Sequence, residues 1–220
     1  MLSVREKFDT ELHSCQDQLI HLSNMAVDAL GKSISALLNH DIDGALEVIE
    51  NDVKINRLEE EINDRVILLI ARQGPVATDL RRLIVIIKVA TDMERVGDYA
   101  VNIAKETIRL GKEEHLPPIA QIEKMHELAS TMLLQVIDAF VEEDVSKARE
   151  IAELDDQVDD LYGEVLTQLM LAGSSDPDKI SQITQLAFIG RYMERSADHA
   201  TNIAEQLFYL VRGRHYDLNK

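Results

Sequence analysis

The segment MERVGDYAVNIA at residues 93–104 recurs one hundred residues later as MERSADHATNIA at residues 193–204, with eight of the twelve positions identical. Upstream of each segment the copies stay aligned at an offset of 103, which places Asp52 opposite Asp155. Self-similarity over such a distance is the signature of a duplicated structural unit. The repeated segment therefore determines the architecture expected for the rest of the chain.

Both copies are predicted to be helical. The chain has only four prolines and 4% aromatic residues, which leaves long stretches in which apolar residues recur every three to four positions. This period is typical of helices in an antiparallel bundle. Ser3 begins a capping-box pattern, and Asp176 followed by Pro177 marks the start of the last helix. The expected helices span residues 3–39, 41–74, 75–111, 119–141, 144–173 and 176–213.

The predicted fold is all-α, with two tandem three-helix bundles related by internal pseudo-symmetry and built from six long antiparallel helices. The first repeat is expected over residues 1–114 and the second over residues 115–220. Hydrophobic residues make up 45% of the chain, enough for a substantial core. The longest apolar runs fall far short of the roughly 20 residues that cross a bilayer, so no transmembrane segment is predicted.

Charge and cysteine content exclude several classes of protein. The chain has 40 acidic and 23 basic residues, a formal net charge of −17, and such a polyanion is a poor ligand for nucleic acid. Its single cysteine, Cys15, cannot form an internal disulfide, and no secretory leader begins the chain. These features predict a cytoplasmic protein in a reducing compartment.

Carboxylates recur at matching places in the two repeats. Glu94 and Asp98 lie one turn apart at the border of the apolar stripe of the third helix, and Glu194 and Asp198 repeat this arrangement on the sixth. An isolated acidic pair with this spacing is usually a solvated face. Its recurrence in both halves instead favours a common function for the two pairs.

The second and fifth helices carry acidic groups within their apolar stripes. Asp52 and Asp155 occupy these positions, and Asn56 and Asp159 follow one turn later. A buried carboxylate must be protonated or paired with a cation. If the helices of each repeat pack together, oxygen atoms from the two sides would face each other and could hold a metal ion. The predicted ligands are Asp52, Asn56, Glu94 and Asp98 in the first repeat and Asp155, Asp159, Glu194 and Asp198 in the second.

Oxygen donors favour Mg²⁺, Mn²⁺ or iron over a closed zinc site, although the sequence leaves the choice among iron, manganese, magnesium and zinc open. Arg95 and Arg195 offer an alternative without metal, because their guanidinium groups could neutralise the carboxylates directly. Asn102 and Asn202 could orient the ligands or form only a polar strip. His199 is interpreted as an incidental surface residue, because Tyr99 occupies its place in the first repeat.

With these motifs the sequence resembles the PhoU family of bacterial phosphate-transport accessory proteins. The resemblance rests on the duplicated segments, on GPVATDLR at residues 74–81, and on the paired motifs of the second and fifth helices. It implies a cytoplasmic, dimeric negative regulator of phosphate uptake and phosphate-starvation signalling that carries metal ions on Glu/Asp-x-x-x-Asp motifs. It also implies contact with the ATPase of the phosphate ABC transporter and with a phosphate-sensing histidine kinase. Asn56 departs from the acidic form of the motif, which implies a weaker first site.

Three functions compete at this point. The first is a non-enzymatic, metal-binding adaptor, the second a metal-free helical scaffold, and the third a carboxylate-bridged iron enzyme. A ferritin-like iron site requires Glu-x-x-His on two helices, whereas this chain has that pattern only at Glu123 and His126, outside the acidic constellation. The sequence therefore favours the adaptor.

Overall fold

The structure, a computed structural model, describes residues 4–216 and residue 218. The described residues form six α-helices and no strand, which confirms the all-α prediction. None of these helices has an apolar stretch long enough to cross a membrane. The helices are α1 (Val4–Leu38), α2 (Ile42–Gln73), α3 (Ala77–Leu110), α4 (Ile119–Glu142), α5 (Val145–Ser175) and α6 (Ile180–Arg212), with a short 3₁₀ turn, η1 (Pro177–Lys179), before α6.

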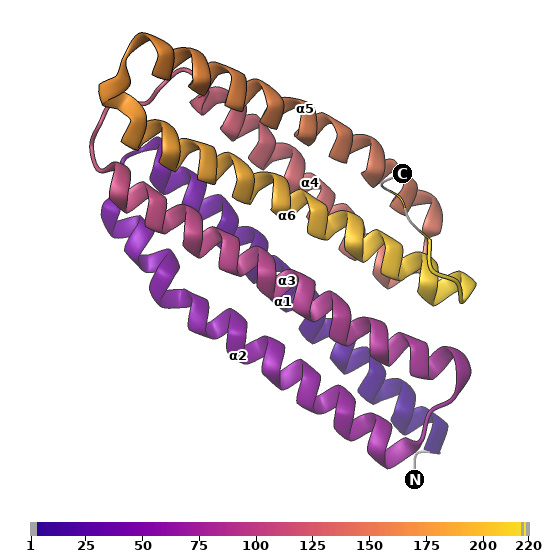
Figure 1. Cartoon of the computed structure of the whole chain (residues 1–220). Coiled ribbons are helices and arrows are strands. Elements are labelled where there is room, and N and C mark those ends of the chain that lie inside the picture. The colour runs from indigo at the N-terminus through magenta and orange to yellow at the C-terminus, as the bar shows by residue number, and fades with distance from the viewer. Residues whose placement is uncertain (1–3, 217, 219–220) are drawn as a thin grey trace.

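The six helices form two three-helix bundles that lie side by side (Figure 1). Helices α1, α2 and α3 pack together in one bundle and α4, α5 and α6 in the other, as predicted from the repeat. The bundles meet chiefly through α3 and α6, which run antiparallel along the middle of the molecule, and also through α1 and α4. The buried apolar residues of both bundles belong to a single continuous core.

Several predicted helix ends are confirmed by their caps. The Asp41 side chain accepts a hydrogen bond of 2.9 Å from the backbone N–H of Gly44 at the start of α2. Asp144 accepts one of the same length from Ser146 at the start of α5. Helix α2 ends at Gly74, whose φ of 55° lies in the left-handed region that glycine tolerates best. The predicted cap at Ser3 lies outside the described residues.

Other ends differ from the prediction. Helix α5 continues through Gly173 to Ser175, because a glycine inside a packed helix costs only about 1 kcal/mol relative to alanine and does not by itself end the helix. Asp176 then accepts a hydrogen bond from the backbone N–H of Asp178, so it caps the 3₁₀ turn, and α6 begins only at Ile180. Helix α3 likewise begins at Ala77 instead of at Pro75.

The packing of α2 against α3 is especially close at Gly97. A Cβ atom at this position would lie 3.1 Å from two carbons of the Ile55 side chain and 3.6 Å from Asp52 Oδ1. The absence of a side chain therefore lets α2 approach α3 beside one of the predicted ligands. The second repeat has Ala197 at the corresponding position.

Candidate metal centre

The first carboxylate cluster lies where α2 packs against α3. The Asn56 amide donates a hydrogen bond of 3.0 Å to Asp52 Oδ2 on the same face of α2. Burial raises the pKa of Asp52, and the charge of Asp98 on α3 raises it further. The pKa of Glu94 is raised by burial and then by Asp98, with smaller contributions from Glu59 and Asp52. The four predicted ligands of the first repeat thus share one electrostatic environment.

The second cluster lies at the corresponding place between α5 and α6. Asp155 is only 5% exposed, and burial, followed by the charges of Asp198 and Asp159, raises its pKa to about 6. Burial and the charge of Asp198 raise the pKa of Glu194 to about 7. Asp159 is exposed, but its pKa is also raised, first by partial desolvation and then by Asp198. The predicted ligands of the second repeat therefore also share one electrostatic environment.

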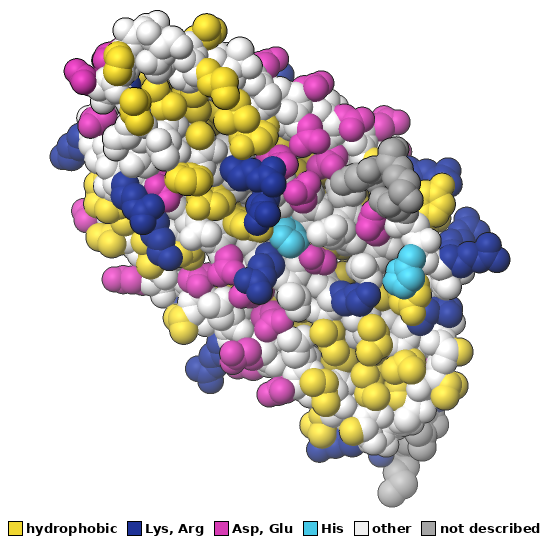
Figure 2. All heavy atoms as spheres, in the orientation of Figure 1, with side chains coloured by type: hydrophobic (Ala, Val, Ile, Leu, Met, Phe, Trp, Pro, Cys, Tyr) yellow, Lys and Arg dark blue, Asp and Glu magenta, His cyan; other side chains and the backbone are white. Residues whose placement is uncertain are grey.

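On the face of the molecule shown in Figure 2, acidic side chains gather in one area over α5 and α6 and in another over α2 and α3. We call the two sets of predicted ligands the first cluster (Asp52, Asn56, Glu94 and Asp98) and the second cluster (Asp155, Asp159, Glu194 and Asp198).

Arginines neutralise the clusters only in part. Arg95 lies 2.8 Å from Asp98 and 3.6 Å from Glu94. In the second cluster the ion pair to Glu194 comes from Arg191, at 2.5 Å, whereas Arg195 acts on Glu194 through its charge at longer range. Sequence reasoning missed Arg191, although its position one turn before Glu194 on the same helix was a signal for this pair.

The remaining predicted residues contribute less. Asn102 is half-buried and Asn202 is exposed, and neither amide forms a hydrogen bond with a cluster side chain in the part of the chain that the structure describes. The geometry therefore supports a polar strip for these two asparagines and gives no sign that they orient ligands.

The donor chemistry of the clusters suits a hard metal ion. Three buried oxygen atoms, Asp52 Oδ1, Asn56 Oδ1 and Glu194 Oε2, have no hydrogen-bond partner. Such oxygens are costly to bury and are the donors that Mg²⁺, Mn²⁺ and iron prefer. As they stand, however, no three His, Cys, Asp or Glu side chains among the described residues lie close enough together to hold one ion. Chelation would therefore require these side chains to rotate. The unpaired buried oxygens would favour that rotation, because a bound ion would compensate them.

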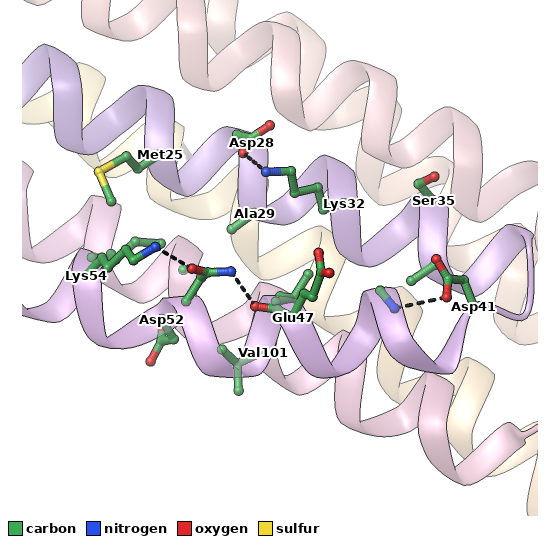
Figure 3. A pocket seen from close by; sticks show the side chains of 16 residues that line it. Met25, Asp28, Ala29, Lys32, Ser35, Asp41, Glu47, Asp52, Lys54 and Val101 are labelled. Atoms are coloured by element: carbon green, nitrogen blue, oxygen red, sulfur yellow. Dashed lines mark hydrogen bonds and ion pairs between the residues drawn. The ribbon is translucent and has the colours of Figure 1, made fainter.

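A cavity of about 380 Å³ lies beside the first cluster, among α1, α2 and α3 (Figure 3). Asp52 and Gly97 are among its lining residues, and Figure 3 shows the Asp52 side chain directed away from α1. The polar groups nearer α1 satisfy one another, since Lys32 pairs with Asp28 at 2.6 Å and Lys54 donates to Asn51 at 2.6 Å.

His199 is not an incidental surface residue, and that interpretation was wrong. Its Nδ1 atom lies 2.8 Å from Asp92 Oδ1 on α3, and the two side chains are only 16% and 18% exposed. The interpretation rested on the repeat that contains His199, whereas its hydrogen-bond partner Asp92 lies in the other repeat.

Substituting Glu194 by glutamine should stabilise the chelator-treated protein more at pH 8 than at pH 5. Folding raises the pKa of Glu194 from 4.5 to about 7. The folded state therefore resists ionisation, and this penalty is absent below about pH 4.5, grows as the pH rises and is complete above about pH 7. Glutamine cannot ionise and escapes the penalty. Thermal unfolding in EDTA should show a melting-temperature difference between variant and parent that grows by several degrees across this range.

The matched control is Glu164→Gln on the exposed surface of α5. Its melting-temperature difference from the parent should stay constant across the same pH range. A constant difference for Glu194→Gln as well would contradict the electrostatic account of the second cluster.

Comparison with known proteins places these features in a family. The family model described as the PhoU domain matches residues 19–107 and 122–207. The "Phosphate-specific transport system accessory protein PhoU homolog" of Clostridium acetobutylicum is 37% identical over 216 residues, covering 98% of this chain and 99% of the relative. The PhoU accessory protein of Escherichia coli K12 is 33% identical and is covered over 87% of its length.

Solved structures agree with the sequence comparisons. The crystal structure of PhoU from Pseudomonas aeruginosa superposes with a TM-score of 0.89 at 33% identity, covering 94% of this chain and all of that one. A phosphate transport system regulatory protein PhoU from Streptococcus pneumoniae gives a TM-score of 0.89 at 31% identity, over 96% of this chain and 99% of that one.

Proposed function

Because this chain belongs to the PhoU family, we propose that it is an accessory protein of a phosphate-specific transport system and carries metal ions on its two carboxylate clusters. The proposed role is regulatory and non-catalytic. The protein would act in the cytoplasm as a homodimer that restrains phosphate uptake and phosphate-starvation signalling. Its partners would be the ATPase of the phosphate ABC transporter and a phosphate-sensing histidine kinase. The transport role is supported by the names of its relatives, which describe accessory proteins of phosphate-specific transport.

The observation that carries the metal proposal is the uncompensated carboxylate in both repeats. Asp52 and Asp155 have no ion-pair partner among the described residues, and burial raises the pKa of each. Replacing water around an anion without supplying a cation costs several kcal/mol. Bound ions would supply that positive charge and link α2 to α3 and α5 to α6. The residues proposed to hold them are the members of the first and second clusters defined above.

A metal-free scaffold has one observation in its favour, which is that Arg95 and Arg191 already pair with cluster carboxylates. Neither arginine forms an ion pair with Asp155, however, and Asp155 is the most deeply buried acid of the two clusters. The iron-enzyme alternative has weaker support, because Glu123 and His126 lie on α4, away from both clusters. His126 is half-buried beside Gly31, and this partial burial lowers its pKa.

Metal content and thermal stability distinguish the adaptor from the scaffold. Protein purified without chelator should contain bound ions, and adding Mn²⁺ to EDTA-treated protein should raise its melting temperature, because an ion that binds only the folded state stabilises it by mass action. At a hundredfold excess over the dissociation constant the gain is about 2.7 kcal/mol for each site. A content below about 0.2 metal per chain, without any thermal gain, would instead support the scaffold.

The transport role is tested separately with purified partners. The metal-loaded chain should bind the phosphate transporter's ATPase subunit or the phosphate-sensing histidine kinase of its own organism, as measured by biolayer interferometry. The absence of binding to both, at high and at low phosphate, would contradict the adaptor role whatever the metal content.

A further inference from the structure

We propose that the two carboxylate clusters are coupled to each other across the interface between α3 and α6. The coupling would run through four side chains, Asp92 and Tyr99 on α3 and Tyr192 and His199 on α6, which we call the inter-repeat clamp. This inference rests on the proposed function only in that the clusters hold ions. The mechanical link that it describes is testable without metal.

The clamp residues contact one another across the two repeats. Asp92 and His199 form a hydrogen bond of 2.8 Å. The rings of Tyr99 and Tyr192 stack with their centroids 6.0 Å apart and their planes at 19°. The Tyr99 ring also lies against His199, at 5.7 Å between centroids. These contacts form one continuous group of four side chains.

The clamp residues bracket the cluster residues along both helices. Asp92 precedes Glu94 by two positions, and Tyr99 directly follows Asp98. On α6, Tyr192 precedes Glu194 by two positions, and His199 directly follows Asp198. Each turn of helix that carries two cluster carboxylates is therefore attached to the other repeat just before and just after them. Because a helix turn is a hydrogen-bonded unit, the turn on α3 is restrained from moving independently of the turn on α6.

Comparison of the two repeats shows that this contact is asymmetric. Positions 92 and 192 correspond in the repeat, as do positions 99 and 199. One contact across the interface is therefore the tyrosine stack, whereas its symmetry mate is the bond between Asp92 and His199. Hydrogen bonds are directional and strengthen when they are partly removed from water, as both of these side chains are. The asymmetric contact adds a geometric restraint to the apolar packing of the interface.

Neutralising one cluster should consequently change the rigidity and the metal affinity of the other. Neutralising the second cluster, whether by an ion or by substitution, removes like-charge repulsion between α5 and α6 around Glu194 and Asp198. Any resulting change in position or rigidity of that turn of α6 passes through the clamp to the turn of α3 that carries Glu94 and Asp98. Coupling between two sites typically changes affinity by a factor of about 5 to 150. We therefore expect at least a fivefold effect of one cluster on the other.

Hydrogen exchange tests the link in EDTA, without metal. The second cluster is neutralised by Glu194→Gln with Asp198→Asn, and exchange is followed in peptides that cover residues 90–102 of α3. With the clamp intact, these peptides should exchange several-fold more slowly after the neutralisation. In a His199→Ala, Tyr99→Ala background the slowing should be confined to α5 and α6. Unchanged exchange in α3 with the clamp intact, or equal slowing without it, would overturn the proposal.

Two further variants test whether the loss of coupling comes from removing the clamp contacts or from general damage to the structure. Tyr99→Phe keeps the ring and should preserve the coupling, whereas His13→Ala removes an exposed histidine from α1 and should leave it unaffected. If the double clamp variant does not fold, His199→Ala alone removes the bond to Asp92 and keeps the tyrosine stack. It should then reduce the coupling without abolishing it, and a coupling of full strength would contradict the role of His199.

Mn²⁺ titration separates this inference from the proposed function. The Mn²⁺ affinity of the first cluster should differ at least fivefold between the intact chain and the Glu194→Ala, Asp198→Ala variant, and this difference should vanish when the clamp is removed. Binding at both clusters without any such difference would refute the coupling and leave the proposed function standing. Coupled hydrogen exchange in a chain that binds no metal would refute the metal proposal and support the clamp.

Discussion

Replacing Glu194 and Asp198 together by alanine should abolish metal binding at the second cluster and leave the first titratable, which lowers the metal content of the saturated chain to that of the first cluster. The reason is that each repeat would supply its own proposed ligands, from α2 and α3 in the first and from α5 and α6 in the second. Elemental analysis after equilibrium dialysis against Mn²⁺ measures the result. The clamp would alter the affinity of the remaining site but would not remove its ligands.

The control for this experiment is the pair Asp156→Ala and Asp160→Ala, which removes the same number of charges from exposed positions of α5. Because the long-range electrostatic change is the same, any difference between the two variants reports on direct ligation. The control should retain the full metal content. Loss of both sites in the Glu194, Asp198 variant would show that the two repeats do not bind metal separately.

Substituting Asp155 by asparagine should stabilise the chelator-treated protein at pH 8 and weaken metal binding at the second cluster. Asp155 is 5% exposed between Ile151 and Val158 in the apolar stripe of α5, and its pKa is raised to about 6. Its ionised form is therefore destabilising above that pH, and asparagine keeps the shape without the charge. Since a change of one in pKa corresponds to about 1.4 kcal/mol, the rise from 3.8 to about 6 predicts a gain of about 3 kcal/mol in the free energy of unfolding. Urea unfolding in EDTA and Mn²⁺ titration measure the two effects.

Asp156→Asn is the matched control, because it removes the same charge from the neighbouring, exposed position. It should change the stability at pH 8 by less than about 0.5 kcal/mol. If Asp155→Asn proved destabilising in the absence of metal, the Asp155 carboxylate would have to be satisfied by groups within the protein. The case for a cation at the second cluster would then be lost.

Much of the fold could be predicted because it depends on regular geometry. The 3.6-residue period and the duplicated segment determine six helices in two bundles, and caps such as Asp41 and Gly74 act through bonds within a few residues. The end of α5 could not be predicted in the same way. Gly173 is permissive for a helix end but does not compel one, and the helix continues to Ser175.

The clusters were predictable for a similar reason, since residues four apart on a helix share a face wherever the helix is placed. The counterions were less predictable. Whether Arg191 or Arg195 pairs with Glu194 depends on side-chain conformations on the folded surface. The hydrogen bond between Asp92 and His199 could not be predicted from the sequence. It depends on how one bundle is set against the other, and hydrophobic periodicity, which describes one helix at a time, contains no information about that placement.

The antiparallel contact between α3 and α6 also bears on how such a protein could have arisen. A single ancestral repeat would expose the face that α3 now buries, and two copies could cover it by pairing about a twofold axis. Joining the copies in one polypeptide holds the partners at a high effective concentration, so their association no longer depends on how much protein the cell makes. The halves are then free to diverge, and a residue in one can be matched by a different residue in the other, as Asp92 and His199 are. A symmetric pair of identical subunits could not hold an unequal bond at only one of two equivalent positions.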